Sequence, residues 1–305
     1  MYDSLIIGAG KIAAGFDSPD DCNVLTQAHA YKKHPEFNLL GFYDVDMEKA
    51  RLAAGKWGCR CFENLQDVAN VDVVSICTPD DCHLESVQQA VKLQPKLIFL
   101  EKPVAGCGAD AVKLMDMVQN LPVAVNYSRR YVKEFQNLRE RIAAGEFGNF
   151  SGGSGYYGKG FIHNGSHMID LLRFLIGEIV SIHSIDSMAD FYDHDPSLST
   201  DVFFQNNVRF KMGAVDCNCY TIFELDLFFP KARVRIVDSG FRIEIYKVVA
   251  DEMFVGHRRL QKAENFSTEL ASAMGNALEN ISNFLNGKEK LLCNLEDGYE
   301  AMRHG

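Results

Sequence analysis

The chain begins with an apolar strand that runs directly into a glycine turn, and this junction limits the possible fold more than any other segment. Residues 4–7 are Ser-Leu-Ile-Ile, and Gly8-Ala9-Gly10 follows. Glycines let the backbone turn tightly and approach a pyrophosphate, which then faces the N–H groups of the next turn, beginning at Lys11-Ile12. Ala13 holds the third position of this fingerprint and still permits close packing of helix on strand. The segment therefore predicts a dinucleotide-binding edge of a parallel sheet.

A second buried strand, residues 97–100 (Leu-Ile-Phe-Leu), leads directly into Glu101-Lys102-Pro103. In an open parallel sheet, ligands bind outside the carboxyl ends of the strands. Lys102 would then lie beside the bound dinucleotide, and the segment Glu101-Lys102 would form part of that site. The alternative is a surface salt bridge between Lys102 and Glu101.

The bulk composition excludes several classes of protein. Of 305 residues, 47% are hydrophobic and 24% are charged, which indicates two packed domains of ordinary size. The net charge of −10 argues against a nucleic-acid partner, because binding phosphates requires a basic face. No apolar run approaches the ~20 residues that span a bilayer. Because residues 8–15 interrupt the apolar stretch at the N-terminus, we also expect no signal peptide.

The cysteine pattern indicates a reducing compartment. The nine cysteines include no C-x-x-C pair. The C-x-C pairs Cys59/Cys61 and Cys217/Cys219 would each point two thiols to one face of a strand, which leaves a metal site as the minor alternative. We expect no metal, and we interpret the cysteines as reduced thiols of a cytoplasmic protein.

Residues 1–122 alternate between short apolar runs and helical patterns. This alternation predicts parallel strands joined by right-handed helical crossovers. The expected strands are residues 5–7, 39–43, 71–77, 97–100 and 123–125, and the expected helices are 46–57, 82–93 and 109–120. The first domain, residues 1–122, is thus expected to hold a doubly wound parallel sheet.

The pattern changes in residues 123–305, which we expect to form a second domain. Helices are expected over residues 131–144 and 166–176, followed by successive strands from 179 to about 257 and two closing helices. Strands that follow one another without helices favour antiparallel pairing. The fold class is therefore α/β, with a second α+β domain that has an open, mostly antiparallel sheet.

Asp44 is the expected ligand of the adenosine ribose, because it ends the second strand of the first domain. Asp46 is a rival, and a turn aspartate is the alternative. A carboxylate repels a 2′-phosphate, so we expect NAD to be preferred, with NADP possible because Lys11 or Lys49 could offset the repulsion. The polar stretch 15–23 predicts a loop that breaks the first helix, which resumes near Thr26; the loop either contacts substrate or is a tolerated insertion.

The strand over residues 71–77 ends in Thr78-Pro79, where proline stops sheet pairing and is expected to turn the chain over the cofactor. His83 follows on the next helix. Two interpretations of His83 stay open: it contacts the cofactor, or it caps the helix or is solvated.

These segments, together with residues 165–172 (Gly-Ser-His-Met-Ile-Asp-Leu-Leu), resemble the glucose–fructose oxidoreductase, inositol dehydrogenase and rhizopine catabolism family. The resemblance covers nearly the whole chain in the right order. It implies a Rossmann domain followed by an α+β domain, NAD or NADP as cofactor, and hydride transfer at a hydroxyl-bearing carbon of a sugar or cyclitol. It also implies homodimers or homotetramers built through the open sheet.

The resemblance also implies roles for individual residues. Lys102 would hydrogen-bond the reacting hydroxyl and stabilise developing alkoxide charge. His167 would act as the general base, with a salt bridge for Lys102 and helix capping for His167 as the alternatives. Asn126 would line the cofactor side of the cleft, and Arg130 would meet an anionic substrate group or form a salt bridge between domains.

One position departs from the family pattern. Many relatives carry an aspartate four residues before the histidine, and here that position is His163. Either His163 takes over polar contacts to the substrate or the proton relay differs. Asn164 is expected at the same place, and Asp170, one helical turn after His167, either orients His167 or caps the helix.

The sequence therefore predicts an NAD(P)-dependent oxidoreductase acting on CH–OH groups of a sugar, nucleotide sugar or cyclitol. Two alternatives stay open. One is a non-catalytic sensor or regulator of the same fold that binds cofactor or sugar, and the other is a dehydrogenase for a substrate that is not a sugar.

Overall fold

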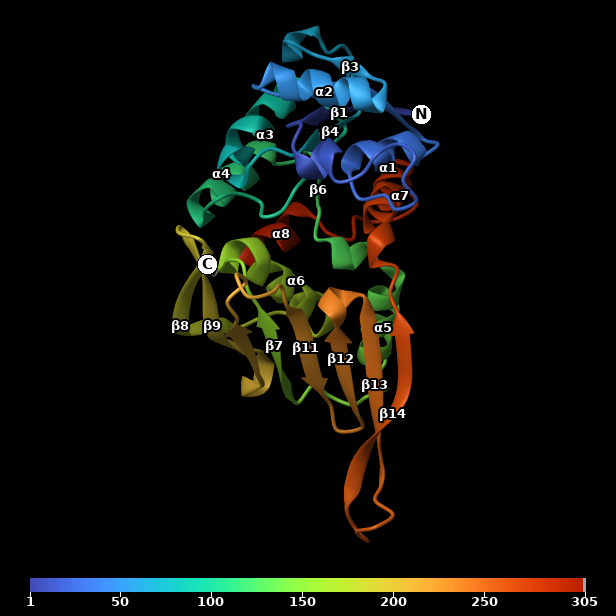
Figure 1. Cartoon of the computed structure of the whole chain (residues 1–305), viewed down its shortest axis with the longest axis vertical. Helices are drawn as coiled ribbons and strands as arrows, with labels where there is room; N and C mark the ends of the chain where they lie inside the picture. The colour runs from blue at the N-terminus through green and yellow to red at the C-terminus, as the bar shows by residue number, and fades with distance from the viewer. Residues whose placement is uncertain (304–305) are drawn as a thin grey trace. The chain divides into compact units, whose positions relative to one another are not determined.

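The structure is a computed structural model that describes residues 1–303. It divides into two compact units, one formed by residues 1–131 together with 271–303 and the other by residues 132–270 (Figure 1). This division differs from the expected domains 1–122 and 123–305, because the two closing helices pack in the first unit. The packing of those helices in the first unit is a tertiary contact that local sequence patterns cannot predict.

The first unit contains the expected parallel sheet. Its strands are β1 (Tyr2–Ile7), β2 (Phe37–Tyr43), β3 (Arg60–Cys61), β4 (Val73–Ile76), β5 (Leu97–Leu100) and β6 (Val123–Val125). Their order is β3-β2-β1-β4-β5-β6, and every neighbouring pair is parallel. This is the order of a doubly wound dinucleotide-binding sheet, whose ligand edge lies at the carboxyl ends of β1 and β4. The apolar runs of β4 and β5 are fully buried, as a sheet covered on both faces requires.

Six helices belong to the first unit. They are α1 (Gln27–Lys33), α2 (Met47–Trp57), α3 (His83–Lys92), α4 (Gly108–Val118), α7 (Ala273–Leu285) and α8 (Leu295–Met302). Helix α7 contacts α1, and α8 contacts β6 and α4. A glycine is needed for the contact of α8 with β6, since a Cβ at Gly298 would lie 2.9 Å from Val125 Cγ2. Residues 271–303 are therefore an integral part of the first unit.

The first crossover helix is interrupted, as the sequence predicts. A π-helical turn, Lys11–Gly15, follows Gly10, and α1 begins only at Gln27. The Thr26 side chain caps α1 by accepting a hydrogen bond from His29 N. Between these elements the chain forms the loop that the polar residues 15–23 indicated.

The second unit is an eight-stranded sheet with two helices, α5 (Lys133–Ala143) and α6 (Ser166–Leu175). Its strands are β7 (Gly152–Tyr157), β8 (Ser181–Tyr192), β9 (Asp195–Phe203), β10 (Arg209–Ala214), β11 (Phe223–Phe228), β12 (Ala232–Val237), β13 (Arg242–Ala250) and β14 (Arg258–Ser267). The order is β14-β13-β12-β11-β7-β10-β9-β8, and only the β7–β10 pair is parallel. This confirms the expected mostly antiparallel sheet. Helix α6 packs closely on β7, because a Cβ at Gly155 would lie 2.8 Å from Met168 Sδ.

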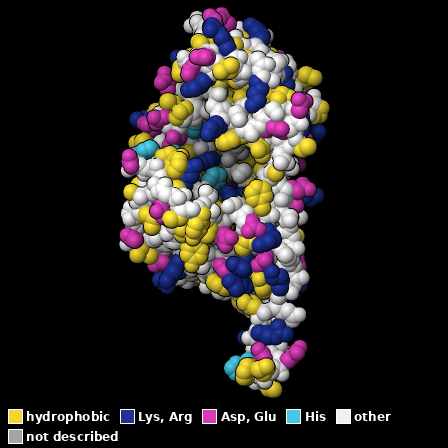
Figure 2. Space-filling model, viewed as in Figure 1, with side chains coloured by type: hydrophobic (Ala, Val, Ile, Leu, Met, Phe, Trp, Pro, Cys, Tyr) yellow, Lys and Arg dark blue, Asp and Glu magenta, His cyan; other side chains and the backbone are white. Residues whose placement is uncertain are grey.

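The face of this sheet that points away from α5 and α6 carries a ladder of ion pairs. Arg233 binds Asp226 on the neighbouring strand through two hydrogen bonds, at 2.6 and 2.5 Å. Glu244 accepts a hydrogen bond from Lys262 Nζ at 2.7 Å. Figure 2 shows side chains of both charges gathered over the visible face of the second unit, and apolar side chains at the end of the β13–β14 hairpin. The open face is thus a mixture of charged and apolar side chains.

Candidate cofactor pocket and histidine site

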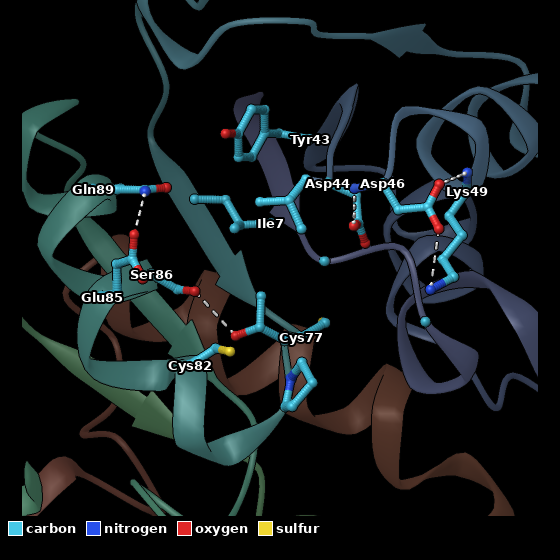
Figure 3. Close-up of a pocket in the computed structure, with 15 residues that line it drawn as sticks. Ile7, Tyr43, Asp44, Asp46, Lys49, Cys77, Cys82, Glu85, Ser86 and Gln89 are labelled. Atoms are coloured by element: carbon cyan, nitrogen blue, oxygen red, sulfur yellow. Dashed lines mark hydrogen bonds and ion pairs between the residues drawn. The ribbon is translucent and has the colours of Figure 1, made fainter.

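A pocket of about 360 Å³ lies at the carboxyl ends of β1, β2 and β4 in the first unit. Its lining residues come from the glycine turn, from the end of β2 with the start of α2, and from the end of β4 with α3 (Figure 3). They include Gly8, Gly10, Tyr43, Asp44, Asp46, Lys49, Thr78, Pro79, Glu85, Ser86 and Gln89. Five of the ten residues expected to bind cofactor therefore meet in one cavity: Gly8, Gly10, Asp44, Thr78 and Pro79.

The two glycines of the turn serve different purposes. Gly8 has φ = +94°, and a Cβ there would lie 2.7 Å from backbone atoms of Cys77 and Thr78. Gly8 therefore allows the turn to pass close to the end of β4. A Cβ at Gly10 would meet no atom within 4 Å, so the backbone there borders open space that a ligand can approach. These features fit a dinucleotide, because its pyrophosphate requires close approach to the backbone.

Asp44 lies at the pocket and is fixed by backbone hydrogen bonds. Its Oδ2 accepts from Ala9 N at 2.7 Å, and its Oδ1 accepts from Asp46 N at 2.8 Å. The carboxylate therefore couples the glycine turn to the end of β2. Asp46, the rival for the ribose, caps α2 by accepting from the backbone N–H groups of Glu48 and Lys49. It also pairs with Lys49 Nζ at 3.3 Å, so a lysine that lines this part of the pocket has an anionic partner.

The opposite wall of the pocket is formed by α3, from which only His83 was expected at the cofactor. Ser86 Oγ lies 3.1 Å from Thr78 Oγ1, and Glu85 and Gln89 line the same wall (Figure 3). Because α3 begins just after Pro79, its first two turns face the edge of the sheet where β4 ends. The sequence signal that could have predicted these α3 residues is the position of Thr78-Pro79 at the end of a strand, directly before the helix.

Three other residues expected at the cofactor lie in the buried structure that supports the strand ends. His83 is buried, with Nδ1 at 2.9 Å from Pro103 O and Nε2 at 3.0 Å from Thr78 O. Burial lowers the pKa of His83. The Glu101 Oε1 atom accepts hydrogen bonds from Gln27 Nε2 at 2.6 Å and from Asn126 Nδ2 at 2.8 Å. Burial raises the pKa of Glu101. A direct cofactor contact by His83, Glu101 or Asn126 stays a prediction.

The other residues of the first unit that were expected at the cofactor or the substrate lie outside this pocket. Lys102 lies two residues after the end of β5 and is half-buried. Lys11 lines a second cavity, on the α2 side of the glycine turn, and Ile12 is the next residue of the π-helical turn. Arg130 is buried and binds Asp297 Oδ1 at 3.1 Å and Leu292 O at 3.1 Å. The salt bridge of Arg130 lies within the first unit and is not the expected one between domains, and a contact of Arg130 with an anionic substrate group stays a prediction.

The two histidines of the expected catalytic site, His163 and His167, lie at the junction of a turn with α6. His163 belongs to the π-helical turn Phe161–Gly165, and His167 lies in the first turn of α6. The side chain of Asn164 donates from Nδ2 to Gly158 O at 2.7 Å, and Asp170 is buried in α6. His163 Nδ1 lies 2.7 Å from Asp195 Oδ2, a residue that the sequence analysis did not consider.

Neither a metal site nor a transmembrane helix emerges from the described part of the chain. No group of three or more His, Cys, Asp or Glu side chains among residues 1–303 is arranged to hold a metal ion. Within the same range, no helix is both long and apolar enough to cross a membrane.

Comparison with known proteins finds relatives for the N-terminal part of the first unit. Residues 3–128 match the family model described as "Oxidoreductase family, NAD-binding Rossmann fold". A segment of the chain is 27% identical over 148 residues to inositol 2-dehydrogenase of Rhizobium meliloti, covering 47% of this chain and 41% of that protein. The chain spans less than half the length of the first curated relatives that it matches.

Solved structures share the fold of the whole chain. UDP-N-acetylglucosamine 3-dehydrogenase GnnA from Acidithiobacillus ferrooxidans has a TM-score of 0.76 at 20% identity, covering 99% of this chain and 94% of that one. The WlbA dehydrogenase from Bordetella pertussis, in complex with NADH and UDP-GlcNAcA, has a TM-score of 0.76 at 17% identity, covering 98% and 92%. The matched family model, the glycine turn and the strand order of the first unit agree with one another, so residues 3–128 are similar to the oxidoreductase family with an NAD-binding Rossmann fold.

Proposed function

We propose that this protein is an NAD(P)-dependent oxidoreductase that acts on a hydroxyl or keto carbon of a sugar, nucleotide sugar or cyclitol. The observation that carries the proposal is the pocket at the carboxyl ends of β1, β2 and β4, which combines an open glycine turn with the fixed carboxylate of Asp44. The named relatives support the substrate class, since they include an inositol dehydrogenase and a nucleotide-sugar dehydrogenase.

In this proposal the first unit holds the cofactor. The glycine turn approaches the pyrophosphate, and Asp44 accepts hydrogen bonds from the adenosine ribose. A bound nicotinamide supplies the acceptor or donor of the hydride. Lys102, at the carboxyl end of β5, donates a hydrogen bond to the reacting oxygen and stabilises negative charge on it.

The second unit supplies the proton acceptor. His167 takes the hydroxyl proton when the substrate is oxidised and returns it when the substrate is reduced. Imidazole suits this role because its ordinary pKa lies close to neutrality.

Hydride transfer can be tested with a panel of substrates and both cofactors. The panel includes myo-inositol, glucose 6-phosphate and UDP-N-acetylglucosamine, which appear in the names of relatives. Fluorescence of the reduced cofactor reports turnover. Cofactor binding without turnover on any hydroxyl substrate would instead indicate the non-catalytic sensor or the dehydrogenase of another substrate class.

On the substrate that the panel identifies, we expect Lys102→Met to lower kcat by ~10²-fold or more while cofactor binding changes only a few-fold, as electrostatic groups in active sites do. Lys96→Met is the matched control. Lys96 precedes the same strand, β5, and its Nζ pairs with Asp72 at 2.9 Å. Wild-type turnover of Lys102→Met would mean that Lys102 is structural.

We further infer a homodimer or larger homo-oligomer that uses the open face of the second sheet. Tyr156 and Phe228 are exposed there, beside the ion pairs of β11 and β12. We expect sedimentation at micromolar concentration to give at least twice the 34.2 kDa mass of one chain. Phe228→Glu should favour the monomer, and Leu52→Glu, on an exposed part of α2, should not. A wild-type protein that sediments only as a monomer would contradict this inference. Cytoplasmic localisation stays a prediction.

A further inference from the structure

His163 is enclosed by the tip of the β8–β9 hairpin. The two strands end and begin at Tyr192 and Asp195, so only two residues separate them. Asp195 is buried, and its Oδ2 lies 2.7 Å from His163 Nδ1. The Tyr192 ring stacks on the His163 ring, with centroids 4.0 Å apart and planes at 18°. Asp195 therefore fixes the edge of the imidazole ring, and Tyr192 covers its face.

The same carboxylate also fixes the backbone beneath the ring. Asp195 Oδ2 accepts from His163 N at 2.9 Å, and Oδ1 accepts from Ile162 N at 2.9 Å. Gly160 has φ = +86° and leaves room for this carboxylate, which a Cβ at that position would overlap. Asp195 thus caps the turn 161–165 and contacts its histidine side chain at the same time.

This contact selects one form of the imidazole. A carboxylate accepts hydrogen bonds and does not donate them, so Nδ1 of His163 carries the proton in the contact with Asp195. In the neutral ring, Nε2 is then the nitrogen with a lone pair. Carboxylates that bind the second nitrogen of a working histidine set the tautomer and the ring orientation in the same way.

We propose that Asp195 is a positioning residue that holds His163 with Nε2 as a hydrogen-bond acceptor for a hydroxyl of the substrate. The inference rests on the proposed function and adds a specificity determinant to it. His163 accepts the hydrogen bond and thereby selects a hydroxyl or N–H group at that point of the substrate. In this proposal Asp195 and Tyr192 affect substrate binding through the orientation of His163 and do not contact the substrate themselves.

Asp190 provides a matched control at the same hairpin. Its Oδ2 accepts from Lys159 N at 2.5 Å, and its Oδ1 accepts from Ser197 Oγ at 3.1 Å. It is thus a carboxylate that fixes the neighbouring turn and for which the structure gives no bond to the His163 ring. Asp190→Asn disturbs the turn without removing the partner of Nδ1.

The first test measures the imidazole and does not depend on turnover. Nitrogen-15 NMR of the histidine rings at neutral pH, assigned by the signals lost in His163→Gln, reports which nitrogen is protonated. We expect a protonated Nδ1 in the wild type and in Asp190→Asn, and loss of this preference in Asp195→Asn. An unprotonated Nδ1 in the wild type, or an unchanged pattern in Asp195→Asn, overturns the proposal.

The second test is a double-mutant cycle on the substrate found in the panel. Asp195→Asn should raise the KM for that substrate by ~10-fold or more with cofactor affinity unchanged, the scale of lost orienting partners. If Asp195 acts through His163, it should add little to the effect of His163→Gln. Equal effects of Asp195→Asn in both backgrounds would mean that the carboxylate only caps the turn, and the proposal would fail. If no substrate is found, the proposed function fails separately, and the NMR measurement still decides the His163–Asp195 contact.

Discussion

At the scale of single residues, Asp44 is the side chain of the pocket that we expect to discriminate between NAD and NADP. Both of its oxygens already accept backbone hydrogen bonds, from Ala9 N and Asp46 N. A carboxylate has further lone pairs for ribose hydroxyls, so these bonds orient the group without saturating it. If Asp44 binds the adenosine ribose as proposed, its carboxylate would repel a 2′-phosphate, and we therefore expect NAD to be preferred.

Replacing Asp44 should therefore change the ratio of the two cofactor affinities. We expect Asp44→Ser to weaken NAD binding and to shift the NAD-to-NADP preference by roughly 10-fold toward NADP, as loss of one charged contact does. Asp46→Ser is the control, because Asp46 caps α2 and serine keeps that cap. Isothermal titration with both cofactors measures the ratio. Tighter NADP binding by the wild type would remove Asp44 as the discriminating residue.

The sequence could identify residues whose place follows from a strand end, and it could not identify the partners of their side chains. Gly8, Asp44 and Thr78 meet in the pocket because parallel strands end at one edge of a sheet. Glu101 also ends a strand, but its side chain binds Gln27 and Asn126 in the buried interior. Asp195 was not predicted for a related reason: it lies 32 residues after His163 in the sequence, and only the tertiary structure brings the β8–β9 hairpin next to that histidine.

At the scale of elements, the loop between Gly15 and α1 is fastened by one buried side chain. Asp17 accepts hydrogen bonds from Leu25 N, from Thr26 Oγ1 and from His29 Nδ1, at 2.5, 2.5 and 2.8 Å. Burial opposes the ionisation of Asp17, yet these hydrogen bonds outweigh it and hold its pKa below the ordinary value. The loop is thus tied to the first turn of α1 by a carboxylate.

The lowered pKa gives this anchor a defined dependence on pH. A carboxyl group whose pKa is lower in the folded state stabilises the fold above its ordinary pKa, and the stabilisation disappears as the pH falls through the folded value. We expect Asp17→Asn to lower the free energy of unfolding at pH 7 by about 1–3 kcal/mol, through weakened buried hydrogen bonds. The difference from the wild type should shrink below about pH 4. Thermal unfolding followed by circular dichroism across this range measures it.

The control for this anchor is Asp20→Asn, in the exposed part of the same loop. It should unfold like the wild type at every pH. A constant difference between Asp17→Asn and the wild type from pH 3 to pH 7 would mean that ionisation of Asp17 contributes nothing.

Helices and strands with strong periodicity were predicted well, and elements defined by tertiary contacts were not. Helix α2 was expected over 46–57 and spans Met47–Trp57, with Asp46 as its cap. The two-residue strand β3 was not predicted, because its pairing with β2 depends on Gly41, which lets Arg60 approach closely. The π-helical turn Lys11–Gly15 was also not predicted, since five residues carry no helical period.

At the scale of the whole molecule, the first unit is discontinuous in sequence. The chain leaves it after Tyr131 and returns at Ala271. The returning segment is bound by specific contacts, among them a hydrogen bond from Tyr2 Oη to Asn286 Oδ1 at 3.1 Å and a bridge between Ala124 and Asn294. The turn at residues 128–131 contacts α7, so the exit and the return of the chain are neighbours.

A fragment of residues 1–131 should therefore be incomplete even though it contains the whole parallel sheet. We expect it to unfold without a cooperative transition, because β6 loses its contact with α8 and α1 loses its contact with α7. Joining residue 131 to residue 271 through a short Gly-Ser linker should restore cooperative unfolding and NAD binding. Calorimetry of both proteins tests this, and a cooperative transition of equal midpoint in the shorter fragment would contradict it.

The same discontinuity has a consequence for biosynthesis. Residues 271–303 are made only after residues 132–270, so the nascent parallel sheet waits on the ribosome while the whole antiparallel sheet is translated. Domains generally fold as units during synthesis, in the order in which they emerge. Here the second unit, residues 132–270, is the first whose residues have all been synthesised. The first unit can be completed only after α7 and α8 have been synthesised. Translation speed over residues 132–270 therefore sets how long the uncovered surface of β6 is exposed to chaperones and to other chains.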